Sequence, residues 1–513
     1  MICQFIYLFT SIFIHQNKAA FQMIILTLTL PNYLTQFSMT IPEGQKKVKK
    51  LHITSNHQPD DDQQLVRSSD FDGNEYLSRS NTADWVISIK QKLDRVSPFV
   101  TCSWLDHCIF EVPKHLREID PKAYDPQLVS IGPFHRGKAS LQPKEKHKWR
   151  LLRHLLDRTG HTVELYLEAM ADLEEKTRSC YSVSLDHIES REFVEMMLLD
   201  ACFIIELINA SVKGFIHGGF SWGDPIFTTR GFLPCVQRDL LMLENQLPLF
   251  VLDRLYALTC DPEDHDSVSQ LAVQFFDSVI PGCHNLELEL MKINEPGLHL
   301  LQVIRQCLLP TKSAFLSIGC DPEIKQQPQA LMHCVTALRT SGVKLQKKVT
   351  DKFLDIEFKK GILYIPKLVI HDSTKAIFLN LMAYEQCYPH CSNDVTSYVT
   401  FMDGLINTSR DVGYLRFEGI IDHGLGSDEE VATLFNKICR QFVFDINDCY
   451  LSALSIEVNR YYDYKWNTWR ALLKHDYVSN PWAIVSLLAA IFLIGLTLTQ
   501  TLYSVLAYYI PPP

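Results

Sequence analysis

The sequence WAIVSLLAAIFLIGLTLTQTLYSVLAYYI runs from Trp482 to Ile510, and its twenty-nine residues include no charged side chain. A helix of this length, rising about 1.5 Å per residue, extends roughly 40 Å, whereas the hydrocarbon core of a bilayer is about 30 Å thick. We therefore predict a single C-terminal transmembrane helix, with the stretch from Trp482 to Leu506 as the membrane span. The residues before it have to fold as a separate body.

Basic residues lie on one side of this span. Lys465, Arg470 and Lys474 precede it, and no charged side chain follows it. Because basic flanking residues stay on the cytoplasmic side, we expect a single-pass protein, placed at the plasma membrane, whose large domain faces the cytoplasm. The lipid bilayer is then its first partner. The segment 486–495 also contains small residues, which allow close packing of helices in lipid, so a homo-oligomer stays open.

The composition before the span is that of a folded globular protein, with 47% hydrophobic and 21% charged residues. The net charge of -10 argues against a general nucleic-acid binder, which usually carries a basic stripe. Fifteen cysteines without regular spacing in a long chain indicate reduced, buried thiols and favour a cytosolic body.

The N-terminal region differs in composition from the rest. Residues 1–38 are a hydrophobic extension that has no basic start and is interrupted at residues 15–18. Three interpretations stay open, namely a spurious extension, an uncleaved anchor and a signal sequence. Residues 39–83 are polar and predict a flexible lead. Residues 84–478 then form the globular domain, and residues 480–510 form the anchor.

Hydrophobic periodicity predicts a mainly α-helical domain with a small β element. Apolar residues at helical spacing predict helices at residues 85–96, 145–156, 193–208, 238–258, 298–308, 328–338, 375–387, 394–406, 428–438 and 449–474. Trp149, Leu152 and Leu156 share one face of the second of these. Around residues 353–370 the period changes, and two short strands are expected on either side of a Lys-Lys-Gly turn.

One segment resembles a phosphate-binding loop. Gly132 and Gly137-Lys138 have the required spacing, but a P-loop needs Ser or Thr directly after the lysine as a Mg²⁺ ligand. Ala139 takes that position, and Pro133 lacks the N–H that such a loop would offer. We therefore expect a tight turn before a helix, and no nucleotide cofactor.

Two short groups contain metal-ligating residue types. Cys387, His390 and Cys391 lie within five residues, and His107 precedes Cys108. A structural zinc site needs four ligands in paired clusters, and neither group has a clear second pair nearby. Ordinary core or loop thiols are the favoured interpretation, so no metal is expected.

Four carboxylates interrupt apolar runs, namely Asp200, Glu206, Glu244 and Glu385. A carboxylate among apolar neighbours has to find hydrogen bonds or shift its pKa. The favoured interpretation is a buried structural network that ties helices together. The alternative is a paired acid site of a membrane-bound enzyme, which requires that these side chains converge in one solvent-reaching pocket. No motif supplies a catalytic nucleophile.

Several ordered blocks resemble a known plant family. They are 109–117 (IFEVPKHLR), 123–126 (AYDP), 129–135 (VSIGPFH), 145–149 (EKHKW), 200–203 (DACF), 239–248 (DLLMLENQLP), 361–366 (GILYIP), 380–387 (NLMAYEQC) and 480–483 (NPWA). In order and content they are similar to the "domain of unknown function 247" proteins. The resemblance extends from Cys108 to Tyr509, and the chain departs from it before Asp84.

The resemblance implies a plant membrane protein with one C-terminal span and no assigned enzyme activity. Some members of the family are implicated in self-recognition between pollen and stigma, and others in defence or growth. With no catalytic motif to carry over, we expect a membrane-tethered recognition or signalling module that binds an unknown protein partner and is not an enzyme. An exposed apolar groove with a polar rim would support this function.

Overall fold

The structure is a computed structural model that describes residues 86–91, 107–260, 266–280, 297–309, 332–350, 354–443, 449–464 and 481–509. Contacts between residues divide the chain into two units, Met1–Lys90 and Gln91–Pro513. In the first unit, residues 86–90 are helical. The rest of the predicted helix at 85–96, apart from residue 91, lies outside the described residues. The four predicted domain ranges stay predictions.

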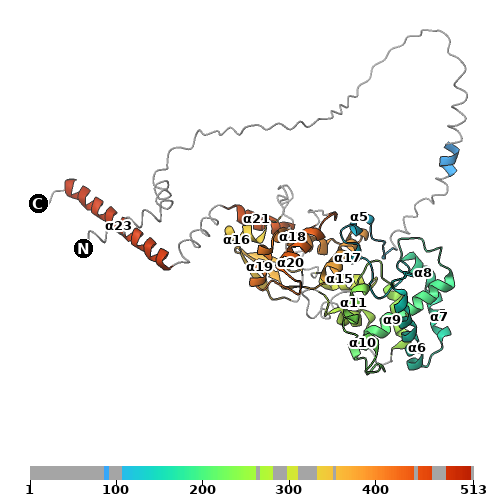
Figure 1. Cartoon of the computed structure of the whole chain (residues 1–513). Coiled ribbons are helices and arrows are strands. Elements are labelled where there is room, and N and C mark those ends of the chain that lie inside the picture. The colour runs from blue at the N-terminus through green and yellow to red at the C-terminus, as the bar shows by residue number, and fades with distance from the viewer. Residues whose placement is uncertain are drawn as a thin grey trace, which may run out of the picture. The chain divides into compact units, whose positions relative to one another are not determined.

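The first part of the second unit is helical (Figure 1). Its elements are α5 (Lys114–Arg117), the 3₁₀ helix η1 (Pro121–Ala123), α6 (Gln142–Thr159), α7 (Val163–Ala171), α8 (Glu174–Ser179), α9 (Ser190–Lys213), α10 (Pro225–Thr228), α11 (Phe232–Leu240), α12 (Leu249–Thr259), α13 (Val268–Phe276) and α15 (Leu300–Leu308). The segments before α6 are mostly turns and short helices.

Helix α9 is the central helix of this part. It is apolar on most of its circumference, as predicted for residues 193–208, and it is buried from Phe193 to Ile208 apart from the exposed Glu195. Helices α6, α7, α12 and α13 pack against it, and Figure 1 shows α6, α7, α8 and α9 gathered together. A helix that is hydrophobic nearly all round needs neighbours on several sides, which explains this arrangement.

The predicted continuous helix at 238–258 is wrong. The structure ends α11 at Leu240 and begins α12 at Leu249, with turns between them. The Asn245 and Gln246 amides donate to backbone oxygens of Asp239, Leu240 and Met242, at 2.7 to 3.0 Å. These side-chain bonds replace helical ones, and Pro248 then stands at the N-cap of α12.

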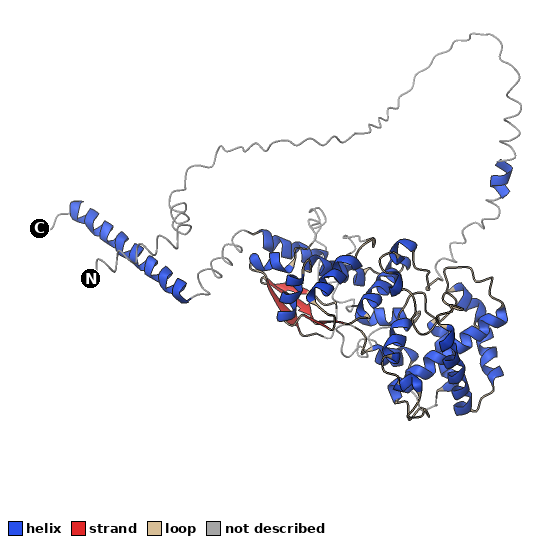
Figure 2. Ribbon diagram, in the orientation of Figure 1, coloured by secondary structure: helices blue, strands red, loops and turns tan. Residues whose placement is uncertain are grey.

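The second part combines helices with two small sheets. Its elements are α16 (Val335–Thr340), β1 (Lys344–Lys348), β2 (Glu357–Lys359), β3 (Ile362–Pro366), β4 (Leu368–Ile370), α17 (Thr374–Cys387), α18 (Asp394–Leu405), α19 (Ser409–Phe417), β5 (Ile421–His423), α20 (Asp428–Ile438), α21 (Ser452–Asp463) and α23 (Pro481–Tyr509). Figure 2 shows the strands in red beside the helices.

The larger sheet has the strand order β1-β3-β2, with β1 parallel and β2 antiparallel to β3. Lys360 and Gly361 join β2 to β3 with φ angles of 52° and 77°. Positive φ at both residues of a two-residue loop suits the twist of a hairpin. The predicted Lys-Lys-Gly hairpin is therefore confirmed, whereas β1 and the parallel β4–β5 pair were not predicted.

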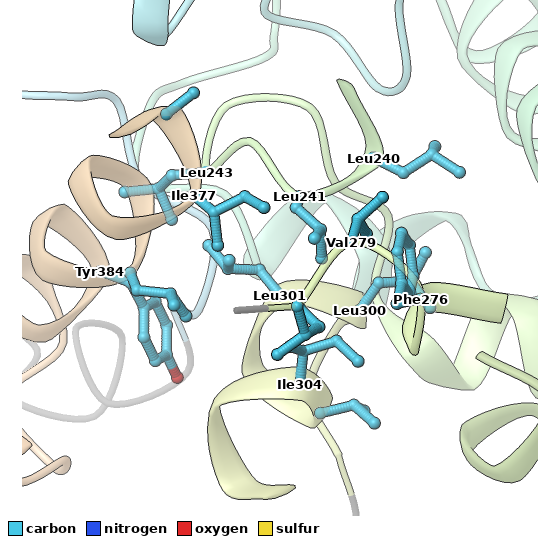
Figure 3. Close-up of a cluster of buried hydrophobic side chains, with 14 of the residues drawn as sticks. Leu240, Leu241, Leu243, Phe276, Val279, Leu300, Leu301, Ile304, Ile377 and Tyr384 are labelled. Carbon is cyan, nitrogen blue, oxygen red and sulfur yellow. The ribbon is translucent and has the colours of Figure 1, made fainter. Parts of the chain in front are cut away.

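The two helical parts share a buried core (Figure 3). Leu240 ends α11, Leu241 and Leu243 lie in the break that follows, and the core there includes Phe276 of α13 and Leu301 of α15. Ile377 and Tyr384 of α17 belong to the same cluster. The fold class, mainly α with a small β element, is confirmed.

Candidate functional site

The four predicted carboxylates are all buried, but they belong to separate contacts. Glu206 and Asp200 lie on α9, Glu385 lies on α17, and Glu244 lies in the break after α11. Each is bound by its own set of cations or amides, and none lines the groove described below. The structure therefore does not bring them together in one solvent-reaching pocket.

Glu244 contacts the segment before α5, the last residue of α5 and the turn that contains His135. Its Oε1 accepts a hydrogen bond from the Val112 amide at 2.7 Å and one from Arg117. His135 Nε2 lies 3.3 Å from Oε2 without the alignment of a hydrogen bond. Burial alone raises the pKa of Glu244, but the contacts with His135, Arg117 and the Val112 amide outweigh it and hold the pKa below its usual value.

Asp200 and Lys148 form a buried ion pair between α9 and α6. The Lys148 ammonium lies 2.6 Å from Asp200 Oδ1 and also donates to the Ser130 carbonyl at 2.5 Å. Asp200 Oδ2 accepts from the Gly132 amide at 2.8 Å. A buried charge is tolerated when it is paired and hydrogen-bonded, and this pair fastens the turn at Gly132 to the two helices.

Glu206 and Glu385 make two further pairs. Glu206 accepts from Arg158 at 2.7 Å and contacts His154 Nδ1 at 2.9 Å, so it joins α9 to α6. Glu385 accepts from Arg305 at 2.8 Å and from the Thr396 amide at 2.8 Å, so it joins α17 to α15 and α18. In each case the carboxylate bonds to the helices around it.

Sequence reasoning missed further buried carboxylates, namely Asp239, Asp394 and Asp411, of which Asp239 makes the most backbone contacts near Gly132. Its side chain is fully buried and accepts from the amides of Gln127, Leu128 and Val129, at 2.7 to 3.2 Å. Asp239 directly precedes the apolar residues Leu240 and Leu241 in the sequence, and this apolar neighbourhood was the signal that could have identified it as buried. Together with Asn245, which accepts from the Ile131 amide at 2.6 Å, it holds the extended segment that leads to Gly132.

The segment similar to a phosphate loop forms turns that lead to α6. Its Lys138 donates to Asp125 at 3.0 Å. The Gly132 amide donates to Asp200 and is therefore not available to a phosphate. Within the described ranges, no three His, Cys, Asp or Glu side chains are placed to hold a metal ion. Cys387, His390 and Cys391 are among the residues to which that statement applies.

An apolar groove lies between α6, α7 and α9. Its cavity volume is about 630 Å³, which is within the usual range of ligand sites. The apolar wall consists of Trp149 and Leu152 of α6, Val163 and Leu167 of α7, and Val194 and Leu198 of α9. The predicted face with Trp149 and Leu152 therefore borders the groove, and Trp149 is 53% exposed although it lies within an apolar wall.

Charged side chains form the rim of this groove. Glu168 comes from α7, and Arg191 and Glu195 come from the first turns of α9. All three are exposed, and within the described part of the chain none has an ion-pair partner. An apolar wall with a charged rim is typical of a binding surface.

Helix α23 is the one described helix that is long and apolar enough to cross a membrane. Its most apolar segment is Leu488–Leu506, with a mean hydropathy of 1.7, and none of that segment is buried by the rest of the structure. The serine and threonine hydroxyls of α23 donate to carbonyls four residues earlier, for example from Ser486 to Trp482 at 2.9 Å.

These features define a large helical protein with a small sheet, an apolar groove and one long apolar C-terminal helix. The chain belongs to the DUF247 family, described as plant proteins of unknown function, whose family model matches residues 109–496. The expected resemblance is therefore confirmed over most of the chain.

Two relatives from Arabidopsis thaliana are similar to the chain. The UPF0481 protein At3g47200 is 34% identical over 421 residues, which cover 78% of this chain and 87% of the relative. The putative UPF0481 protein At3g02645 is 23% identical over 516 residues, with coverage of 82% and 94%. No solved structure matches the chain.

Proposed function

We propose that this protein is a membrane-tethered recognition or signalling module that binds a protein partner in the groove between α6, α7 and α9. The observation that supports it is the apolar wall around the half-exposed Trp149, bordered by unpaired charges. Large aromatic side chains in partly covered apolar surfaces contribute strongly to protein binding. We expect no catalysis by the four predicted carboxylates, because each is bound to the segments packed around it.

The charges on the rim favour one kind of partner. The rim contains two carboxylates, Glu168 and Glu195, and one guanidinium, Arg191. The partner is an amphipathic helix whose apolar side chains enter the groove and whose flanking Lys or Arg meets Glu168 or Glu195. Helices bind grooves between helices in this way, and a cation beside Trp149 also gains from its ring face.

Helix α23 supplies the membrane tether. Its twenty-nine residues exceed the length that a bilayer requires. The i–4 hydrogen bonds of its hydroxyls satisfy groups that would otherwise be costly in hydrocarbon. We place the large domain in the cytoplasm at the plasma membrane, because basic residues precede the span. A second copy of the chain remains a candidate partner for α23.

Protease protection tests the topology of the tether. The full-length protein carries one tag at each end and is expressed in plant cells, and intact vesicles with their cytoplasmic side outward are treated with protease. We expect digestion of the large domain and protection of the C-terminal tag. A glycosylated and protected large domain would contradict the cytoplasmic placement. Recovery of the whole chain in the carbonate-soluble fraction would contradict the tether itself.

A peptide library tests the groove. The full-length protein in lipid nanodiscs selects binders from a library of displayed helical peptides with randomised faces. We expect enriched peptides that combine an apolar face with a flanking Lys or Arg. Substitution of Trp149→Ala should weaken their binding about 30-fold, since a buried aromatic anchor contributes about 2 kcal/mol. Glu195→Arg should weaken the binding of peptides with a flanking Lys or Arg more than the binding of peptides without one.

Glu175→Arg is the matched control, because Glu175 is an exposed residue of α8 that does not line the groove. It should leave binding unchanged. Enriched peptides that bind the Trp149→Ala variant as tightly as the parent protein, or that have acidic flanking residues, would contradict this use of the groove. A small apolar dye that binds the groove while all helical peptides fail would show that the occupant is a small ligand.

A further inference from the structure

A group of lysines lies on the outer face of the larger sheet. The register pairs Lys344 of β1 and Lys359 of β2 with the same residue, Ile362 of the central strand β3. Paired residues point to the same side of a sheet, so the two lysines flank Ile362. Lys360 follows in the hairpin turn, and Lys348 lies further along β1. We call these four residues the lysine surface.

The lysine surface carries more positive than negative charge. Two carboxylates lie next to it: Glu357 pairs with Lys359 and lies 3.4 Å from Lys348, and Asp355 lies 2.8 Å from Lys348. Lys344 and Lys360 are exposed and have no carboxylate partner within the described ranges. Two ammonium groups are therefore free to bind an external anion, although the whole chain has a net charge of -10.

The hairpin turn that carries Lys360 contacts the helix that leads to the membrane span. A Cβ on Gly361, the second residue of the hairpin turn, would lie 2.5 Å from the Tyr461 hydroxyl, so Tyr461 of α21 rests on this turn. Its ring also meets Phe358 of β2 edge to face, at 5.7 Å, on the face of the sheet opposite to Lys359. Helix α21 ends at Asp463, and α23 begins at Pro481.

This connection limits how far the sheet can be from the bilayer. Even a fully extended chain between Asp463 and Pro481 spans at most roughly 60 Å. In the sequence this connection contains Lys465, Arg470 and Lys474, so it is basic as well. Cytoplasmic leaflets have negative surface potentials that attract basic segments next to a span. The exposed Tyr464, at the end of α21, is of the residue type that favours the headgroup region.

From this geometry we infer that the lysine surface, with Lys344, Lys359 and Lys360 at its centre, binds the anionic headgroups of phospholipids. The inference rests on the proposed membrane tether and adds a second, electrostatic contact to it. It fixes which end of the large domain faces the bilayer, and the groove between α6, α7 and α9 is not part of that contact.

Acetylation of lysines tests the inference. The full-length chain is reconstituted in nanodiscs of phosphatidylcholine alone or with about one-third phosphatidylserine, and acetylation rates are measured for each lysine by mass spectrometry. We expect Lys344, Lys359 and Lys360 to react at least threefold more slowly in the anionic discs. Because exposed charges are screened within about 10 Å at moderate salt, 0.5 M NaCl should remove the difference. Lys146 and Lys437, exposed on α6 and α20, are the reference lysines.

Charge reversal gives a second measurement. The double variant Lys344→Glu and Lys360→Glu should lose the effect of phosphatidylserine at Lys359, whereas Lys437→Glu should keep it. Equal rates in the two kinds of disc, or equal slowing at the reference lysines, would overturn the inference while leaving the tether intact. A chain that does not enter discs of either composition would instead overturn the proposed tether, so the two failures are distinguishable.

Discussion

Gly132 lies so close to Gln246 that a Cβ on the glycine would be 2.7 Å from the Gln246 carbonyl oxygen. Its φ of +69° is also one that residues with side chains rarely adopt. The turn at Gly132 therefore fits against the break between α11 and α12 only because residue 132 has no side chain. Asp200, which accepts from the Gly132 amide at 2.8 Å, also fixes this turn.

Substitution of Gly132→Ala should lower the free energy of unfolding by about 3 kcal/mol or more, since a backbone clash adds to the cost of a left-handed residue. Gly137→Ala is the matched control. Gly137 has a φ of +79°, and a Cβ added there would meet no atom within 4 Å, so only about 1–2 kcal/mol is expected. Urea unfolding of the purified chain measures both, and equal losses would contradict the close contact.

The Glu385–Arg305 pair should be the most costly of the ion pairs to break. Both side chains are buried, and Glu385→Gln leaves the Arg305 guanidinium without its main counter-charge. We expect a loss of about 3–5 kcal/mol. Asp157→Asn removes the exposed pair with Arg153 at 3.8 Å and should change stability by no more than about 0.5 kcal/mol. A small effect of Glu385→Gln would show that Asp394 or solvent compensates Arg305.

Lys360 offers a stabilising substitution. Its φ of 52° places a lysine where hairpin turns favour Asn or Gly. Lys360→Asn should therefore raise the unfolding midpoint by an amount equivalent to about 0.5–1 kcal/mol. Lys344→Asn, an exchange of another exposed lysine in the same sheet, should not. A destabilised Lys360→Asn variant would mean that the lysine side chain itself supports the turn.

Asp403 should make stability depend on pH. Burial raises its pKa to about 6 from 3.8, although Arg440 opposes the shift. Between these two values the folded state holds more protons than the unfolded state, so this group stabilises the fold at low pH and loses that contribution as the pH rises through 6. The loss is at most about 3 kcal/mol.

Asp403→Asn should consequently be more stable than the parent protein at pH 7 and similar to it at pH 4. Thermal unfolding at both pH values measures this difference. Asp157→Asn serves as the control for a general effect of charge. A parent protein and an Asp403→Asn variant with parallel pH profiles would contradict the raised pKa.

The helices of this protein were largely predictable because they depend on local pattern. The range predicted at 428–438 coincides with α20, and the ranges predicted at 375–387 and 394–406 each differ from α17 and α18 by one residue. The helix predicted at 238–258 failed because side chains of Asn245 and Gln246 compete with the backbone for hydrogen bonds. Whether these side chains win that competition depends on the residues packed around them, and hydrophobic periodicity contains no information about it.

An apolar groove with a polar rim was expected for a recognition module, but the residues that form the groove were not predicted. Periodicity placed Trp149 and Leu152 on one face of α6, but Val163, Val194 and their neighbours reach the same cavity only through the packing of α7 and α9. Conversely, Asp200, Glu206, Glu244 and Glu385 were identified individually, while their distribution over separate contacts required coordinates. Strands β1, β4 and β5 were missed because none of them pairs through a local hairpin: β1 pairs in parallel with β3, and β4 pairs in parallel with β5.

By itself the sequence determined the mainly helical class, the hairpin at Lys360-Gly361, the long apolar C-terminal helix and the family. The first three follow from residues close together in the chain, through helical spacing, turn preference or an uninterrupted apolar run. The family follows from the resemblance of the ordered sequence blocks. Only the tertiary structure decided which buried carboxylate meets which partner, where the groove opens and which lysines gather beside α21. Those contacts join residues that are distant in the sequence, and the packing of the whole domain selects among them.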